Sequence, residues 1–113
     1  MAGSVLVVEP YADLRAGIAS ALRRRHYACD AVATPDDAAL MLRDHDYACV
    51  VVDVDVPGST TEFVSSLSEE SSIILITDGD SCDMRDSVHP MLRKPFGGEE
   101  LIAIVERRRT VRG

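Results

Sequence analysis

Short apolar runs alternate along this chain with longer segments that have the period of a helix, and this alternation constrains the fold more than any other feature. The apolar runs lie at residues 5–8, 27–32, 48–52, 73–76 and 91–93. Helical patterns lie between or after them, at residues 13–25, 35–44, 60–67 and 97–109. Such alternation predicts βα units joined by right-handed crossovers. We therefore expect an α/β fold, a doubly wound five-stranded parallel sheet with helices on both faces.

Local signals support several of these elements. The sequence Thr34-Pro35-Asp36-Asp37 is typical of a helix start, with threonine as N-cap, proline at the first helical position and acids in the first turn. Residues 48–52 are apolar without alternation, which indicates a strand buried on both faces. Residues 79–87 are polar and poorly patterned, and they fit either a short helix or a loop.

Length and composition narrow the classes of protein. The 113 residues suffice for one domain, expected at residues 1–106, with residues 107–113 as a basic tail or the start of a linker. The net charge of −7 argues against a broad nucleic-acid-binding surface. No secretory signal and no membrane-spanning apolar run is recognisable, so we expect a cytoplasmic protein with no membrane partner. Three widely spaced cysteines do not form a disulfide or zinc pattern.

Polar side chains stand where the predicted strands end. Glu9 follows the first strand, and Asp53 follows the third, with Asp55 two residues later. Thr77 follows the fourth strand, and Lys94 follows the fifth. Ligands of open parallel sheets bind at the carboxyl ends of the strands. Two or three acids, a hydroxyl and an ammonium at this edge suit phosphate chemistry, since they offer cation ligands, a carboxylate nucleophile and donors for phosphoryl oxygens.

These residues carry a resemblance to a known family. The chain resembles the receiver domain of two-component response regulators in four stretches, in the family's order: VLVVE, VVVDVDVPG, IILIT and MLRKPFGGEEL. The most specific stretch is Lys94-Pro95-Phe96, and Asp53 with Pro57 four residues later is nearly as specific. The resemblance implies a flavodoxin-like (CheY-like) sheet with the strand order 2-1-3-4-5. It also implies a cis bond between Lys94 and Pro95.

The same resemblance implies roles for the strand-end residues. Asp53 would accept a phosphoryl group from a histidine kinase or phosphotransfer protein, while Lys94 and Thr77 would contact that group. Thr77 and Met91 would form the switch, and Glu9, Asp53 and Asp55 would hold Mg2+. The partners implied are the phosphodonor and a downstream effector protein or fused output domain, with homodimerisation as a further option. No direct contact with nucleic acid and no independent enzyme activity are expected.

The chain departs from the family's pattern at informative positions. Pro10 stands where the family usually has a second acid that binds magnesium directly, so we expect magnesium affinity to be weakened or lost. Met91 replaces a usual aromatic residue of the switch, and His89-Pro90 replaces a small pair. The segments on either side of Thr77 are also short, which predicts shortened third and fourth helices. The chain is therefore an atypical example of the pattern.

Two other functions remain open from the sequence. The first is a pseudo-receiver, an interaction module regulated without phosphorylation, and Pro10 and Met91 favour it. The second is a small haloacid-dehalogenase-like phosphatase, because Asp53-Val54-Asp55-Val56 resembles that family's D-x-D motif. The D-x-D strand comes third in this chain, and no acid pair follows Lys94, so this interpretation is the weaker one.

Overall fold

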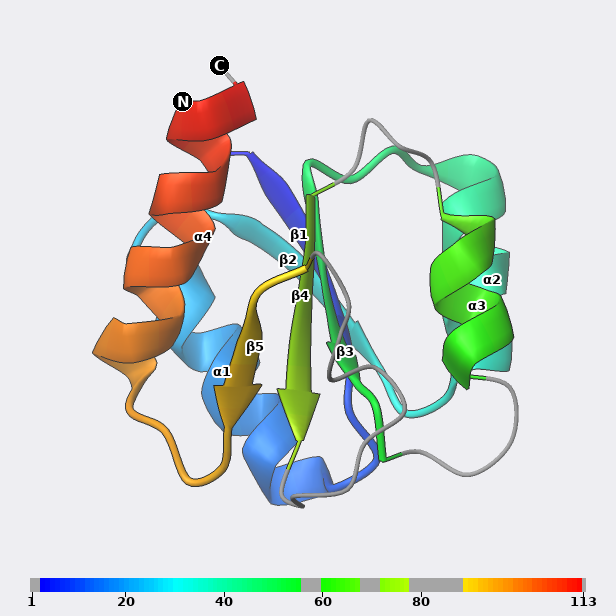
Figure 1. The fold of residues 1–113 in the computed structure, drawn as a ribbon, viewed down its shortest axis with the longest axis horizontal. Helices are drawn as coiled ribbons and strands as arrows, with labels where there is room; N and C mark the ends of the chain where they lie inside the picture. The colour runs from blue at the N-terminus through cyan, green and yellow to red at the C-terminus, as the bar shows by residue number, and fades with distance from the viewer. Residues whose placement is uncertain (1–2, 56–59, 68–71, 78–88, 113) are drawn as a thin grey trace.

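The strands form one parallel sheet in the order β2-β1-β3-β4-β5. This computed structural model describes residues 3–55, 60–67, 72–77 and 89–112. The strands are β1 (Ser4–Val8), β2 (Ala28–Val32), β3 (Cys49–Asp53), β4 (Ser72–Thr77) and β5 (Met91–Arg93). They run in one direction through the middle of the molecule (Figure 1). The predicted α/β class and strand order 2-1-3-4-5 are confirmed.

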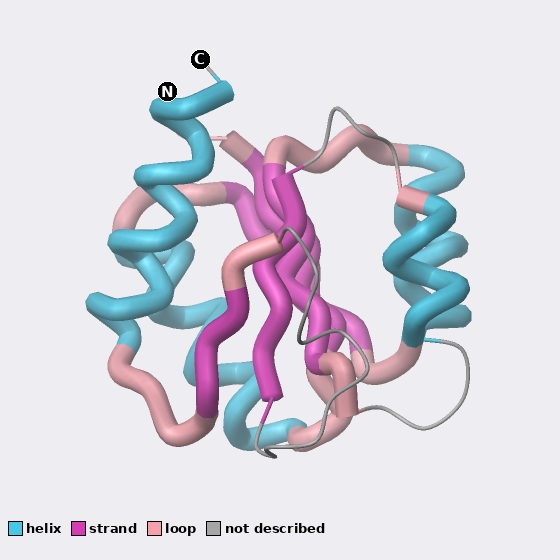
Figure 2. The backbone as a smooth tube through the Cα atoms, in the orientation of Figure 1, coloured by secondary structure: helices cyan, strands magenta, loops and turns pink. Residues whose placement is uncertain are grey.

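Helices cover both faces of the sheet (Figure 2). One face carries α1 (Ala12–Arg24) and α4 (Gly98–Arg112), and the other carries α2 (Pro35–Asp44) and α3 (Thr60–Ser66). Helix α3 has only 7 residues, in keeping with the shortened third helix expected from the sequence. The short helix or loop expected at residues 79–87 lies outside the described residues, as does Pro57. The label α4 therefore belongs to the last helix, which the sequence predicts from residue 97.

Helix α4 is longer than the sequence pattern indicates. It begins at Gly98 and continues to Arg112, past the expected end at Arg109. Most of the segment 107–113 expected as a tail is therefore helical in its backbone. A domain boundary at residue 106 stays a prediction. Within the described residues, no helix combines the length and the apolarity that a membrane crossing requires.

The side chains of each central strand alternate between two apolar cores. Val5 and Val7 of β1 belong to the core beneath α1 and α4, whereas Leu6 and Val8 belong to the core beneath α2 and α3. All five residues of β3 are buried, which explains why residues 48–52 show no polar alternation. Burying one such side chain contributes about 1.5–3 kcal/mol. The two cores fix the strand ends relative to one another.

Two caps determine how helices meet the strands. The hydroxyl of Thr34 accepts a hydrogen bond from the Asp37 N–H at 3.1 Å, as the sequence predicts for an N-cap. At the end of α1, His26 has a φ of 71°, and its N–H donates to Arg23 O while the Tyr27 N–H donates to Leu22 O. This is a Schellman motif with histidine at the left-handed position. Because Tyr27 closes the motif, β2 begins one residue later than predicted.

The strand order reverses around β1. The chain leaves β1 for β2 on one side and later returns to β3 on the other side. Consequently α1, which follows β1, and α3, which follows β3, lie on opposite faces of the sheet. In sheets of this kind, the carboxyl ends of the two strands beside such a reversal, here β1 and β3, are the usual position of a ligand site.

Candidate functional site

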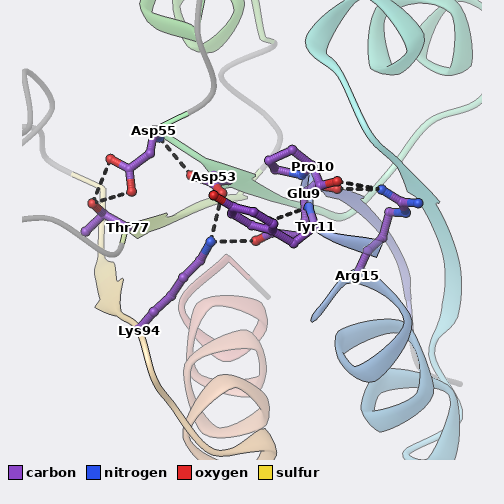
Figure 3. Close-up of polar contacts among 8 residues, drawn as sticks. All are labelled: Glu9, Pro10, Tyr11, Arg15, Asp53, Asp55, Thr77 and Lys94. Atoms are coloured by element: carbon purple, nitrogen blue, oxygen red, sulfur yellow. Dashed lines mark hydrogen bonds and ion pairs between the residues drawn. The ribbon is translucent and has the colours of Figure 1, made fainter. Parts of the chain in front are cut away.

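Polar side chains from four strand ends meet at this edge of the sheet (Figure 3). Glu9 follows β1, Asp53 ends β3, Thr77 ends β4 and Lys94 follows β5. The parallel register aligns these ends. Glu9, Asp53 and Thr77 are buried, and the Lys94 side chain is only 11% exposed. The convergence expected from the sequence is therefore present.

Lys94 bridges the two buried carboxylates. Its Nζ lies 2.9 Å from Oε1 of Glu9 and 2.8 Å from Oδ2 of Asp53. Glu9 is 0% exposed and Asp53 is 1% exposed, so neither charge is balanced by bulk water. Charges removed from water are tolerated when they are paired and hydrogen-bonded. The ammonium is thus an integral part of this end of the fold.

Burial and the ion pairs act in opposite directions on the pKa values. Burial raises the pKa of Glu9, and the charge of Asp53 acts in the same direction; Lys94 and the Tyr11 N–H lower it without cancelling the rise. For Lys94, burial alone would lower the pKa, but Asp53 and Glu9 outweigh burial, so the pKa of Lys94 is raised. Lys94 therefore remains protonated at neutral pH.

The second oxygen of each buried carboxylate accepts a backbone hydrogen bond. The Tyr11 N–H donates to Oε2 of Glu9 at 3.1 Å, and the Asp55 N–H donates to Oδ1 of Asp53 at 2.7 Å. The side chain of Asp55 turns toward β4, where the hydroxyl of Thr77 lies 3.0 Å from Oδ1 and 2.9 Å from Oδ2. Asp55 thus engages the hydroxyl expected to contact a phosphoryl group.

Two residues at this edge were not singled out by sequence reasoning. The ring of Tyr11 lies 5.3 Å from Nζ of Lys94, within the range of a cation–π contact, although Tyr11 is 63% exposed. Arg15 donates from Nη1 to the carbonyls of Glu9 at 2.9 Å and Pro10 at 3.4 Å. Tyr11 lies two residues after Glu9, which is the only signal that the sequence gives for it. Its contact with Lys94 cannot be predicted locally, because the two residues are far apart in the chain. Nothing in the sequence around Arg15 signals its role.

The oxygens at this edge do not fit a magnesium ion as they are arranged. Magnesium requires near-octahedral oxygen coordination. Glu9 and Asp53 each present one oxygen to Lys94, and Asp55 presents both to Thr77. Pro10 has no side-chain oxygen. Among the described residues, no group of three or more His, Cys, Asp or Glu side chains is placed to hold a metal.

The remaining positions implied by the resemblance lie on β5 and just after it. Met91 opens β5 opposite Leu75 and packs against the core beneath α2 and α3, two register positions from the pairing of Thr77 with Arg93. The bond between Lys94 and Pro95 is cis, as expected. Met91 therefore lies at the start of β5, two residues before the carboxyl end at which Thr77 pairs with Arg93.

The fold is similar to those of known receiver domains, although the sequence matches no known family. No protein-family model and no curated protein sequence matches the chain. Among solved structures, chemotaxis response regulator CheY4 of Vibrio cholerae matches with a TM-score of 0.84 at 21% identity, over 96% of this chain and 99% of that one. A response regulator receiver protein from Burkholderia phymatum matches with a TM-score of 0.76 at 26% identity, over 91% and 94%. The receiver domain of sensor histidine kinase PA1611 from Pseudomonas aeruginosa, with magnesium coordinated in its active-site cleft, matches with a TM-score of 0.79 at 23% identity, over 95% and 97%.

Proposed function

We propose, on the premise that the chain has the fold of a response regulator receiver domain, that it is a receiver in a phosphorelay and accepts a phosphoryl group on Asp53. The observation that carries the proposal is the position of Asp53 at a strand end, 2.8 Å from the ammonium of Lys94 and beside the strand that ends in Thr77. A carboxylate nucleophile, a cation and a hydroxyl are the groups that phosphoryl transfer to a carboxylate needs.

The proposed reaction is a displacement at phosphorus. An oxygen of Asp53 forms a bond to the phosphorus of a phosphohistidine while the phosphorus–nitrogen bond breaks. The imidazole nitrogen keeps the electron pair and takes up a proton, and Asp53 becomes an acyl phosphate. The phosphodonor is a histidine kinase or phosphotransfer protein, and the receiver itself acts as a signalling module without independent enzyme activity.

Signalling would follow from an exchange of contacts. Lys94 would turn from Glu9 toward the phosphoryl oxygens, and Thr77 would leave the carboxylate of Asp55 for the same group. The contact of Lys94 with Glu9 and that of Thr77 with Asp55 are both short, at 2.9–3.0 Å. The site would thus have one set of hydrogen bonds before phosphorylation and another set after it. Met91 would report the change along β5. The reader of the change is an effector protein, a fused output domain or a second copy of the chain.

We call the cluster of Glu9, Asp53, Asp55, Thr77 and Lys94 at the strand ends the pocket, and its charge predicts slow phosphorylation. Glu9, Asp53 and Asp55 supply three carboxylates against the single ammonium of Lys94, and a phosphoryl donor adds further negative charge. Because Lys94 holds both buried carboxylates and Pro10 adds no oxygen, we propose that magnesium binds this chain weakly.

A phosphorylation-independent interaction module is the second candidate. The observation in its favour is that Lys94 balances Glu9 and Asp53 without any added ion, in a chain whose neighbouring position is Pro10. In this alternative the fold is retained as a binding surface, and the pocket serves stability.

Intact-mass spectrometry after incubation with acetyl phosphate tests the two candidates. Wild type is compared with Asp53→Asn and with the matched control Asp13→Asn, an exposed acid in the first turn of α1. The reaction is run with and without magnesium. A phosphoryl adduct in wild type and Asp13→Asn but not in Asp53→Asn supports the receiver. No adduct on any of the three proteins, at long incubation, supports the interaction module.

A further inference from the structure

Lys94 takes the position between the buried carboxylates that a metal ion bound to β1 and β3 would need. Its Nζ lies 2.9 Å from Oε1 of Glu9 and 2.8 Å from Oδ2 of Asp53. The other oxygen of each carboxylate already accepts a backbone hydrogen bond, from Tyr11 and Asp55 respectively. The two oxygens that face the middle of the pocket are therefore both committed to the ammonium.

The charge of Lys94 is the main stabilisation of one of these oxygens. Oε1 of Glu9 is fully buried, and the ammonium of Lys94 at 2.9 Å balances its charge. The ring of Tyr11, 5.3 Å from Nζ, favours a cation at the same position. These contacts hold Lys94 in place from several sides.

A second cation at this position would be strongly repelled. Magnesium binds oxygen ligands at about 2.0–2.1 Å. If it bound the same oxygens of Glu9 and Asp53, it would lie within roughly 5 Å of Nζ, in a pocket where the effective dielectric constant is low. Pro10 supplies no extra carboxylate to offset that repulsion.

We infer that Lys94 is the resident cation of this pocket, and that Lys94 and a divalent cation exclude one another at Glu9 and Asp53. The structural stability of the pocket then does not depend on divalent cations. A latent metal site emerges only when the charge of Lys94 is removed. This inference stands whether or not Asp53 accepts a phosphoryl group.

Magnesium titration of three proteins tests the inference. Wild type, Lys94→Gln and the control Arg107→Gln, which removes an exposed cation from α4, are titrated by calorimetry at constant ionic strength. Removing the competing charge should tighten magnesium binding by Lys94→Gln at least about tenfold over wild type and over Arg107→Gln. Magnesium should also raise the thermal midpoint of Lys94→Gln more than that of wild type. Equal affinity of wild type and Lys94→Gln overturns the inference.

Two further measurements keep the test decisive. If Lys94→Gln is unfolded without metal, magnesium should restore its circular dichroism spectrum, and failure to do so overturns the inference. Pro10→Asp keeps Lys94 and adds a carboxylate, so its affinity should rise by no more than about threefold. A rise as large as that of Lys94→Gln would show that a divalent cation binds beside Lys94, and it would overturn the inference. None of these assays measures phosphoryl transfer, so their outcome is separate from that of the acetyl phosphate experiment.

Discussion

Replacing Lys94 with methionine should destabilise the fold severely. The variant Lys94→Met keeps an apolar stem but leaves Glu9, 0% exposed, and Asp53, 1% exposed, without the ammonium that lies within 2.9 Å of both. Removing one partner of a buried ion pair costs about 3–5 kcal/mol. Because two carboxylates lose the same partner, we expect a loss in that range. This is a large share of the roughly 5–15 kcal/mol that stabilises a domain.

Urea unfolding followed by circular dichroism at pH 7 measures this loss. With an m value of about 1–3 kcal/mol per molar urea, the midpoint should fall by at least about 1 M. The control Arg107→Met removes an exposed cation and should change stability by less than about 0.5 kcal/mol. A loss below about 1 kcal/mol for Lys94→Met would refute the reasoning, because the two carboxylates would then be screened by solvent.

The pH dependence of this loss has a definite sign. Lys94 acts to lower the pKa of Glu9, which burial already raises, so its removal should raise that pKa further. A carboxyl group with a raised folded-state pKa favours folding below its unfolded pKa and loses that contribution as pH rises through the folded value. The deficit of Lys94→Met relative to wild type should therefore shrink as the pH falls from 7 toward the ordinary glutamate range near 4.5. A deficit that grows in acid would contradict this assignment.

Three other predictions concern residues outside the pocket. Burial raises the pKa of Tyr47, and its 2.6 Å hydrogen bond to Asp30 acts in the same direction. Stability should therefore fall above about pH 10, where the unfolded phenol ionises, and Tyr47→Phe should flatten that fall. The urea series is best run in a Cys29→Ala background, because burial also raises the pKa of Cys29, to about 11. Thr34→Ala should cost about 1 kcal/mol in urea unfolding by removing the N-cap, and Thr34→Ser should cost little. In the same urea unfolding assay, His26→Gly should raise the free energy of unfolding by about 0.5–1 kcal/mol, since glycine adopts the φ of 71° at less steric cost. A lower free energy of unfolding would show that the histidine side chain stabilises the fold by more than its backbone conformation costs.

The sequence predicts the sheet well because a strand that is buried on both faces has an unbroken apolar run in the sequence. The central runs at residues 48–52 and 73–76 are apolar throughout, and all of their residues except the exposed Ala48, which precedes β3, lie in fully buried strands. The N-cap at Thr34 was predictable because its hydrogen bond is local. The sequence pattern predicts a start of β2 one residue too early, since Tyr27 is buried like a strand residue while its N–H closes the end of α1.

The sequence predicts which residues form the site, but it does not predict the contacts that they make. Glu9, Asp53, Thr77 and Lys94 could be brought together because parallel strands end at one edge of a sheet. That Lys94 contacts both acids at once depends on side-chain conformations at positions far apart in the chain. The pairing of Thr77 with Asp55 is likewise a tertiary contact that no local pattern indicates.

Pro10 affects the balance of charge in the pocket. Glu9 and Asp53 carry two buried negative charges, and Lys94 returns one positive charge. A further acid beside Glu9 would add a negative charge that the single ammonium of Lys94 would not balance. With proline at this position, Lys94 pairs with the two buried acids Glu9 and Asp53, and the backbone carbonyl of Pro10 accepts a hydrogen bond from Arg15 at 3.4 Å. Pro10 therefore keeps the negative charge beside Lys94 lower than an acid at that position would.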